Sequence, residues 1–86
     1  MNFKLIEDFV SLAETRNFSK SAKSRNVTQP AFSRRIQQLE NWVGIPLVDR
    51  TSCPTKLTSA GKIFHDVAVT SLKSIYETKA LLKDQT

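Results

Sequence analysis

The sequence has one cysteine, one histidine, two glycines and three prolines in 86 residues. A single cysteine cannot form an internal disulfide, and one cysteine with one histidine cannot supply the four ligands of a structural zinc site. The glycines and prolines all lie from residue 30 onward, and strand-like alternation is scarce, which excludes an all-β fold. There is no glycine-rich phosphate loop, and His65 has no partner base or nucleophile. We therefore expect a helical protein that is stabilised by packing, uses no metal or cofactor and is not an enzyme.

Length and composition predict one small globular domain. A chain of 86 residues is long enough for one such domain but too short to hold a substrate-binding module in addition. The hydrophobic fraction of 40% and the charged fraction of 24% are ordinary for a folded protein in water. No run is apolar enough for a membrane span, and Glu7 and Asp8 interrupt the segment that a signal peptide would need. The expected location is the cytoplasm.

Positive charge is distributed unevenly along the chain. Thirteen Lys and Arg against eight Asp and Glu give a formal net charge of +5. No carboxylate occurs from Thr15 to Leu39, and this stretch contains Arg16, Lys20, Lys23, Arg25, Arg34 and Arg35. Surfaces usually mix both signs, so the block predicts a polyanionic partner. The alternative is a solvated face without a partner.

Two helices are predicted in the first 26 residues. The first covers residues 3–15, with an apolar stripe of Phe3, Ile6, Phe9, Val10 and Ala13 and an opposite side carrying Glu7, Asp8 and Glu14. Ser19 is the expected N-cap of a short second helix that turns Ala22 inward. This helix ends near Asn26, a residue type that tolerates the left-handed conformation of a tight turn.

A third helix is predicted from about Gln29 to residue 43. Thr28 is its expected N-cap, and Pro30 falls in the first turn, where a missing amide hydrogen costs nothing. The apolar residues recur at helical spacing, at Phe32, Ile36, Leu39 and Val43. Gly44 and Pro46 end the helix. Trp42 is expected to pack at its end.

Residues 47–58 predict a small hairpin, and a long last helix follows to about Asp84. The hairpin strands are too short to be stable alone and must pack on the helices. Thr58 or Ser59 is the expected cap of the last helix. The predicted fold is mainly α, a winged helix-turn-helix with a three-helix core and a two-stranded β wing over residues 1–58, followed by a long linker helix over residues 59–86.

The outer side of the third helix is the predicted DNA-reading surface. When Phe32 faces the core, the far side carries Pro30, Arg34, Gln37 and Asn41, with Ser33 beside them and Gln29 at the exposed end. Arg34 can bind guanine O6 and N7, and glutamine can bind adenine in the same bidentate way. Thr28 lies at the helix N-terminus, where open amides and the dipole favour a phosphate. Lys20, Lys23 and Arg35 are candidates for phosphate contacts, and a solvated side chain is the alternative for each.

The wing carries two further candidates, Arg50 and Lys56, for a neighbouring minor groove. For Arg50 the alternative is an ion pair with Asp49 or another carboxylate. The last helix carries an apolar stripe whose outer part extends beyond the core, with predicted dimer contacts at Phe64, Ala68, Leu72, Ile75 and Leu82. The segment near Ile63 is expected to dock on the domain.

These residues together resemble the N-terminal domain of LysR-type transcriptional regulators over essentially the whole chain. The matching segments are FVSLAETRNFSKSA (9–22), VTQPAFSRRIQQLE (27–40), GIPLVDR (44–50) and LTSAG (57–61). The resemblance implies that the helix at 29–43 is the recognition helix, with Gln29, Ser33 and Arg34 at DNA-contacting positions and the wing around Arg50. Arg25 stands where the family usually has Leu, and Val48 where Phe is common. The first departure either weakens the core anchor or adds a phosphate contact.

The resemblance also implies a homodimer that pairs through its linker helices, with four such units often assembling, and binding to imperfect inverted repeats. A complete regulator of this type carries a second, effector-binding domain, so we expect the chain to be a fragment, with a naturally truncated paralogue as the alternative. The predicted function is sequence-specific binding of double-stranded DNA in a bacterial transcription regulator. The alternative is a winged helix that binds protein through its linker helix.

Overall fold

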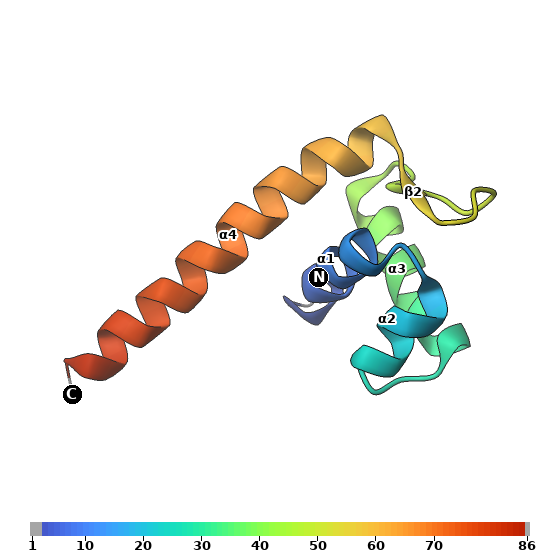
Figure 1. Cartoon of the computed structure of the whole chain (residues 1–86). Helices are drawn as coiled ribbons and strands as arrows, with labels where there is room; N and C mark the ends of the chain where they lie inside the picture. Colours follow the sequence, from blue (N-terminus) through green and yellow to red (C-terminus); the bar gives the residue numbers. More distant parts are fainter. Residues whose placement is uncertain (1–2, 86) are drawn as a thin grey trace.

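The computed structural model describes residues 3–85, which form four α-helices and one two-stranded antiparallel sheet (Figure 1). In chain order the elements are α1 (Phe3–Thr15), α2 (Phe18–Ser24), α3 (Gln29–Val43), β1 (Val48–Asp49), β2 (Lys56–Leu57) and α4 (Ser59–Asp84). Helices α1, α2 and α3 pack on one another, and α4 packs on α1. The predicted winged helix-turn-helix with a long last helix is confirmed.

The core lies between α1, α2, α3 and the start of the wing. Its buried apolar side chains are Leu5, Phe9, Leu12, Ala22, Phe32, Ile36, Leu39, Leu47 and Val48. The predicted inward side of α3 is confirmed, because Phe32, Ile36 and Leu39 are fully buried. Phe18 of α2 closes the core with an edge-on contact to Phe32 at 5.9 Å between ring centroids.

The predicted core face of α1 was only partly correct, because Phe9 is fully buried but the rest of the predicted stripe is not. The buried residues are Leu5, Asp8, Phe9 and Leu12, so the helix is rotated about its axis relative to the expected stripe. Phe3 is 38% exposed and packs edge-on against Tyr76 of α4. The reason is Asp8, which was assigned to the solvent side. A carboxylate can be buried when cationic partners meet it inside the protein, and Asp8 has two.

Capping residues set the helix limits. Asn17, and not the predicted Ser19, caps α2 by accepting a hydrogen bond from the Lys20 amide at 2.9 Å. The turn that follows uses Asn26 at φ 60°, as expected. Thr28 caps α3 through the Ala31 amide at 3.2 Å, and Gly44 ends that helix in the left-handed region at φ 96°. These two predictions are confirmed.

The wing is short and is held to both neighbouring parts of the domain. Val48 pairs with Leu57, and Asp49 pairs with Lys56. Arg16, at the corner between α1 and α2, donates from Nε to the Thr55 carbonyl at 3.1 Å and accepts from the Thr55 amide at 3.1 Å. One cation of the basic block therefore has a structural role.

Helix α4 leaves the domain as a long projection (Figure 1). Thr58 caps it by accepting from the Gly61 amide, and the same hydroxyl donates to the Pro46 carbonyl at 2.8 Å. The overall dimensions of 48 × 26 × 21 Å show how far the helix extends. Within residues 3–85, no helix is both long and apolar enough to cross a membrane.

Of the five predicted dimer contacts, Ala68 and Leu72 are buried within the chain itself and Phe64 is partly buried there. Phe64 meets Phe9 edge-on at 5.6 Å between ring centroids. Ala68 and Leu72 are 3% and 9% exposed on a helix that packs against α1. These side chains hold α4 to its own domain, and Ala68 and Leu72 therefore have little surface left for a partner. The segment near Ile63 docks on the domain as expected, through Ala60, Gly61 and Phe64, while the Ile63 side chain itself is 70% exposed.

Gly61 permits the close approach of α4 to the wing. A Cβ atom at this position would lie 1.9 Å from the Leu47 carbonyl oxygen, which is backbone and cannot rotate away. We expect Gly61→Ala to lower the free energy of unfolding by about 3 kcal/mol or more through forced backbone movement. Urea denaturation measures this change. Ser59→Ala, on the exposed first turn of the same helix, is the control and should stay within about 0.5 kcal/mol. Equal stability of both variants would contradict the close packing.

Candidate nucleic-acid interface

The outer face of α3 is exposed as its helical spacing predicts. Gln29, Pro30, Arg34, Gln37 and Asn41 are all exposed, on a helix whose opposite side forms the core. Gln37 donates from its amide to Asn41 Oδ1 at 3.1 Å. The face is therefore a continuous polar surface along several turns of a rigid helix, which is the shape that a duplex groove admits.

Three cations of the basic block are available at this surface. Lys20, Lys23 and Arg34 are exposed, and no hydrogen bond or ion pair joins their side chains to another residue in the range 3–85. Arg34 lies on the outer face of α3, while Lys20 and Lys23 lie on α2. Because their charges are not compensated locally, they form the cationic part of the surface.

Two polar side chains at the same surface are oriented by neighbours. Ser19 of α2 donates from its hydroxyl to Gln29 Oε1 at 2.7 Å, which leaves the Gln29 amide nitrogen to donate outward. Ser33 Oγ accepts from Arg50 Nη1 at 2.8 Å and keeps its own hydrogen for another acceptor. Gln29, Ser33 and Arg34 are thus a set of hydrogen-bond donors along the first half of α3.

Arg25 and Arg35 turn inward to the buried carboxylate of Asp8. Arg25 Nε lies 2.8 Å from Asp8 Oδ1, and Arg35 Nε lies 2.6 Å from Asp8 Oδ2. Arg35 Nη2 adds a third bond, to Oδ1 at 3.0 Å. Arg35 was predicted to contact phosphate, but two of its nitrogens bind Asp8. The open question on Arg25 is also answered: its guanidinium anchors α1 through Asp8 and, at 3.5 Å, through Glu7.

The pKa of Arg25 reflects this site. Partial burial lowers the pKa of its guanidinium, but the hydrogen bond and charge of Asp8, with those of Glu7, outweigh burial and raise it. Arg25 is therefore held in its charged form. The basic block consequently divides into structural cations, namely Arg16, Arg25 and Arg35, and cations that remain at the surface.

The N-terminus of α3 has fewer open amides than expected. Pro30 has no amide hydrogen, and the Ala31 amide already donates to the Thr28 hydroxyl. The Phe32 amide donates to the Thr28 carbonyl at 2.9 Å. A phosphate at this end would therefore depend on the Gln29 amide and on side chains more than on a row of free backbone donors.

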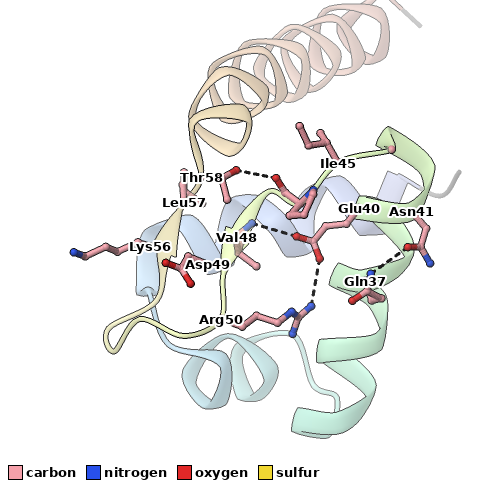
Figure 2. Close-up of a pocket in the computed structure, with 12 residues that line it drawn as sticks. Gln37, Glu40, Asn41, Ile45, Val48, Asp49, Arg50, Lys56, Leu57 and Thr58 are labelled. Atoms are coloured by element: carbon pink, nitrogen blue, oxygen red, sulfur yellow. Dashed lines mark hydrogen bonds and ion pairs between the residues drawn. The ribbon is translucent and has the colours of Figure 1, made fainter.

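A second group of polar contacts, centred on Arg50, joins the wing to α3 (Figure 2). Arg50 Nη2 lies 3.5 Å from Glu40 Oε1, and its guanidinium lies 5.0 Å from the centre of the Phe18 ring. Glu40 is 6% exposed and accepts from the Leu47 and Val48 amides at 2.7 and 3.2 Å. The ion-pair alternative for Arg50 describes the structure, with Glu40 as partner in place of Asp49.

Asp49 organises the wing turn by itself. Its carboxylate accepts from the Thr51 amide at 2.9 Å, from the Thr51 hydroxyl and from the Ser52 hydroxyl at 3.1 Å. The side-chain and backbone hydrogen bonds of Thr51, followed by that of Ser52, lower the pKa of Asp49. Lys56 is exposed on β2, and its side chain extends away from the cleft (Figure 2).

The sequence contained signals for the two buried carboxylates. Glu40 follows Phe32 and Ile36 at spacings of four residues, which places it on the core side of α3. Asp8 lies three residues after Leu5 and four before Leu12. Neither signal identified the partner, because Arg25, Arg35 and Arg50 approach from other elements.

The remaining polar and aromatic candidates form no reactive site. Trp42 was expected to pack and is 60% exposed, so that prediction was wrong. His65 contacts the Phe9 ring at 6.3 Å between centroids. Among residues 3–85, no three His, Cys, Asp and Glu side chains are close enough together to hold a metal ion. The cleft between α3 and the wing is lined by Glu40 and Arg50, whose polar atoms bind each other and the chain.

The arrangement of a short α2, a tight turn, an exposed polar α3 and a β wing defines a winged helix-turn-helix domain. The family described as "Bacterial regulatory helix-turn-helix protein, lysR family" matches residues 3–62. The chain belongs to this family.

Relatives and solved structures agree with this assignment. The chain is 38% identical over 85 residues to the DNA-binding transcriptional dual regulator OxyR of Escherichia coli, covering 99% of this chain and 28% of OxyR. It is 53% identical over 62 residues to the regulator YjiE of the same species, covering 72% of this chain and 20% of YjiE. The chain thus spans about a quarter of the length of these relatives.

Several of the similar solved structures are complexes with DNA, among them structures of DarR and of the BenM DBD. Vibrio fischeri DarR in complex with DNA matches with a TM-score of 0.93 at 48% identity, over 99% of this chain and 29% of DarR. The BenM DBD/benA site 1 DNA complex matches with a TM-score of 0.96 at 32% identity, over 100% of both chains. In the second case the match extends over the whole length of both chains, α4 included.

Removal of the buried negative charge of Asp8 should destabilise the folded domain. In Asp8→Asn, the arginines keep their charges but lose the carboxylate, and we expect a loss of about 3 kcal/mol in the free energy of unfolding. Chemical denaturation followed by circular dichroism measures the change. Glu14→Gln removes a carboxylate from the exposed side of the same helix and should change stability by less than about 0.5 kcal/mol. Similar small losses in both variants would show that Asp8 is not a structural hub.

Proposed function

We propose that the chain is the sequence-specific double-stranded DNA-binding domain of a bacterial transcription regulator, with α3 in the major groove. The observation that carries this proposal is the exposed donor face of α3, formed by Gln29, Ser33 and Arg34 beside uncompensated cations. The DNA complexes of DarR and of the BenM DBD support it, because both share the fold of this chain at more than 30% identity.

The donor face suits the acceptor atoms of the major groove. Arg34 can bind guanine O6 and N7 together, and Ser33 can donate to a neighbouring acceptor. The Gln29 amide nitrogen is the outward donor while Ser19 holds its oxygen. Purine N7, guanine O6 and thymine O4 are the acceptors exposed in this groove. Pro30 lies between Gln29 and Arg34 and can contact a thymine methyl group.

The proposed phosphate contacts lie on α2, at the N-terminus of α3 and on the wing. Lys20 is the first candidate, and the next are Thr28 and Gln29 at the α3 N-terminus, where Gln29 binds Ser19, the residue before Lys20. Arg35 has no leading phosphate role in this proposal, because its guanidinium binds Asp8. Lys56 is the wing cation that extends outward, while Arg50 is bound to Glu40 of α3. The wing itself is proposed to lie along the neighbouring minor groove.

A second copy of the chain is the proposed partner of α4. Of the predicted contacts, Ile75 and Leu82 are 49% and 57% exposed, and Val67 and Leu81 are 58% and 59% exposed. A cluster of exposed large apolar side chains on one helix marks an interaction site. A symmetric dimer would cover it and would place two α3 helices on one inverted repeat. In this assembly residues 1–58 read DNA, and the outer part of 59–86 holds the dimer together. A tetramer is the further assembly proposed for a full-length protein.

The role is binding, not catalysis, and its place is the bacterial cytoplasm, where the DNA is. The support is that the relatives are transcriptional regulators. The alternative function, protein binding through α4, has the exposed Ile75 and Leu82 in its favour. It leaves the donor face of α3 without a use, which is why DNA binding is preferred.

Loss of the Arg34 guanidinium should reduce specific binding selectively. Arg34→Ala removes a bidentate base contact, and we expect it to weaken binding to the selected cognate duplex by about 1 to 3 kcal/mol and to random duplex much less. Fluorescence anisotropy titration measures both affinities. Lys73→Ala, which removes one exposed cation on α4, is the charge-matched control and should affect neither. Equal losses on cognate and random DNA would contradict specific readout by Arg34.

Salt dependence separates DNA binding from the protein-binding alternative. The logarithm of DNA affinity should fall linearly with the logarithm of salt concentration, with a slope of about −0.9 per neutralised phosphate. If Lys20 makes one of these contacts, Lys20→Ala should reduce the slope by about one unit without changing the preferred sequence. A titration between about 50 and 200 mM salt is sufficient. Affinity that does not depend on salt would contradict the proposed function.

A further inference from the structure

One polar contact joins two segments that lie far apart in the sequence. Tyr76 of α4 donates from its hydroxyl to Glu7 Oε2 of α1, 69 residues earlier. The Tyr76 ring also packs edge-on against Phe3, with 6.0 Å between centroids and an interplanar angle of 88°. Tyr76 lies one turn beyond Leu72, after the buried part of α4. We call the pair of Tyr76 and Glu7 the latch.

The position of the latch along α4 gives it leverage over the helix direction. Helix α4 is fixed at its start, where Thr58 and Gly61 meet residues 46 and 47. Tyr76 follows Gly61 by fifteen residues, which is about 22 Å along a helix axis. A shift of about 1 Å at that distance turns the axis by only 2 to 3° about its start. Leu72, buried on the side of α4 that packs on α1, lies about 16 Å along the same axis, so the latch extends the restraint on the angle of α4 by one further turn.

The latch is also connected to the helix that carries the donor face. Glu7 Oε1 lies 3.5 Å from Arg25 Nη2, and Arg25 Nε binds Asp8. The other Asp8 oxygen binds Arg35 on α3 at 2.6 Å. The polar contacts thus run without a break from α4 through α1 to α3. A displacement of Glu7 would first affect Arg25, because Arg25 binds both Glu7 and Asp8.

The latch is suited to a contact that opens and closes. Tyr76 is 46% exposed, and Glu7 is partly exposed, so water can replace either partner when they separate. The two inner contacts differ, because Asp8 is fully buried and keeps its arginines. The network therefore has a stable inner end at α3 and a labile outer end at α4.

We propose that Tyr76 and Glu7 are positioning residues that set the angle between α4 and the helix-turn-helix, and hence the half-site spacing that the dimer accepts. The inference rests on the proposed function for its consequence on DNA, because α4 pairs two copies there. Each base pair adds about 3.4 Å of duplex. Small changes in the α4 angle alter the separation of the two α3 helices by similar distances, so the spacing reports the angle.

The first experiment measures the latch without DNA. Spin labels are placed at the native Cys53 in the wing and at Lys79→Cys on α4, and doubly labelled chains are diluted with unlabelled chains so that distances within one copy dominate. In Tyr76→Phe the ring contact to Phe3 remains and only the hydroxyl is lost. We expect a broader distance distribution in Tyr76→Phe and in Glu7→Gln than in the wild type. Unchanged distributions in both variants would overturn the proposal.

Glu77→Gln is the matched control for Glu7→Gln. It makes the same chemical change on an exposed glutamate that pairs only within α4, with Lys73 at 4.0 Å. It should leave the distance distribution as in the wild type. Broadening in the control equal to that in Glu7→Gln would show that charge on any helix surface produces the effect, and would count against the latch.

The second experiment measures the consequence on DNA by selecting bound sites from random duplexes. We expect the wild type to enrich an inverted repeat with one dominant spacing. Tyr76→Phe should enrich the same half-site with spacings spread by at least one base pair, while affinity for a single half-site stays within about twofold. The same spacing in both proteins would contradict the latch. If the wild type enriches no sequence, the proposed function fails, and the label distances still decide whether the latch exists.

Discussion

The fold depends on one buried negative charge. Asp8 is fully buried in α1 and binds Arg25 and Arg35, which belong to the two sides of the turn between α2 and α3. Burial of a carboxylate is unfavourable unless charge and hydrogen bonds compensate it, so the three side chains favour one arrangement of three helices. That arrangement turns Phe32 and Ile36 inward. The outer face of α3 is exposed as a consequence.

A second buried carboxylate does the same for the wing. Glu40 binds the Leu47 and Val48 amides and the Arg50 guanidinium, which in turn holds Ser33. The two carboxylates divide the cations of the domain into those that build it and those that remain for a polyanion. Lys20 and Arg34 are exposed, and no ion pair joins either of them to a carboxylate within residues 3–85.

Local patterns were sufficient to predict the elements but not their tertiary partners. Thr28, Pro30 and Gly44 placed both ends of α3 correctly, because caps and breakers act within a few residues. The buried side of α1 was predicted only in part, because apolar periodicity takes no account of Asp8. The cationic partners of this aspartate lie 17 and 27 residues away in the sequence. Arg35 and Arg50 were assigned to DNA for the same reason. Ala68 and Leu72 were assigned to a partner because the sequence does not show where α1 meets α4.

The central claim is that the exposed side of α3 enters the major groove. Methylation interference on a selected duplex tests it directly, because dimethyl sulfate modifies guanine N7, which lies in that groove. We predict interference at guanine N7 positions in two half-sites about one helical turn or a multiple apart on one face of the duplex. Interference confined to adenine N3 in the minor groove, with none at guanine N7, would contradict the claim.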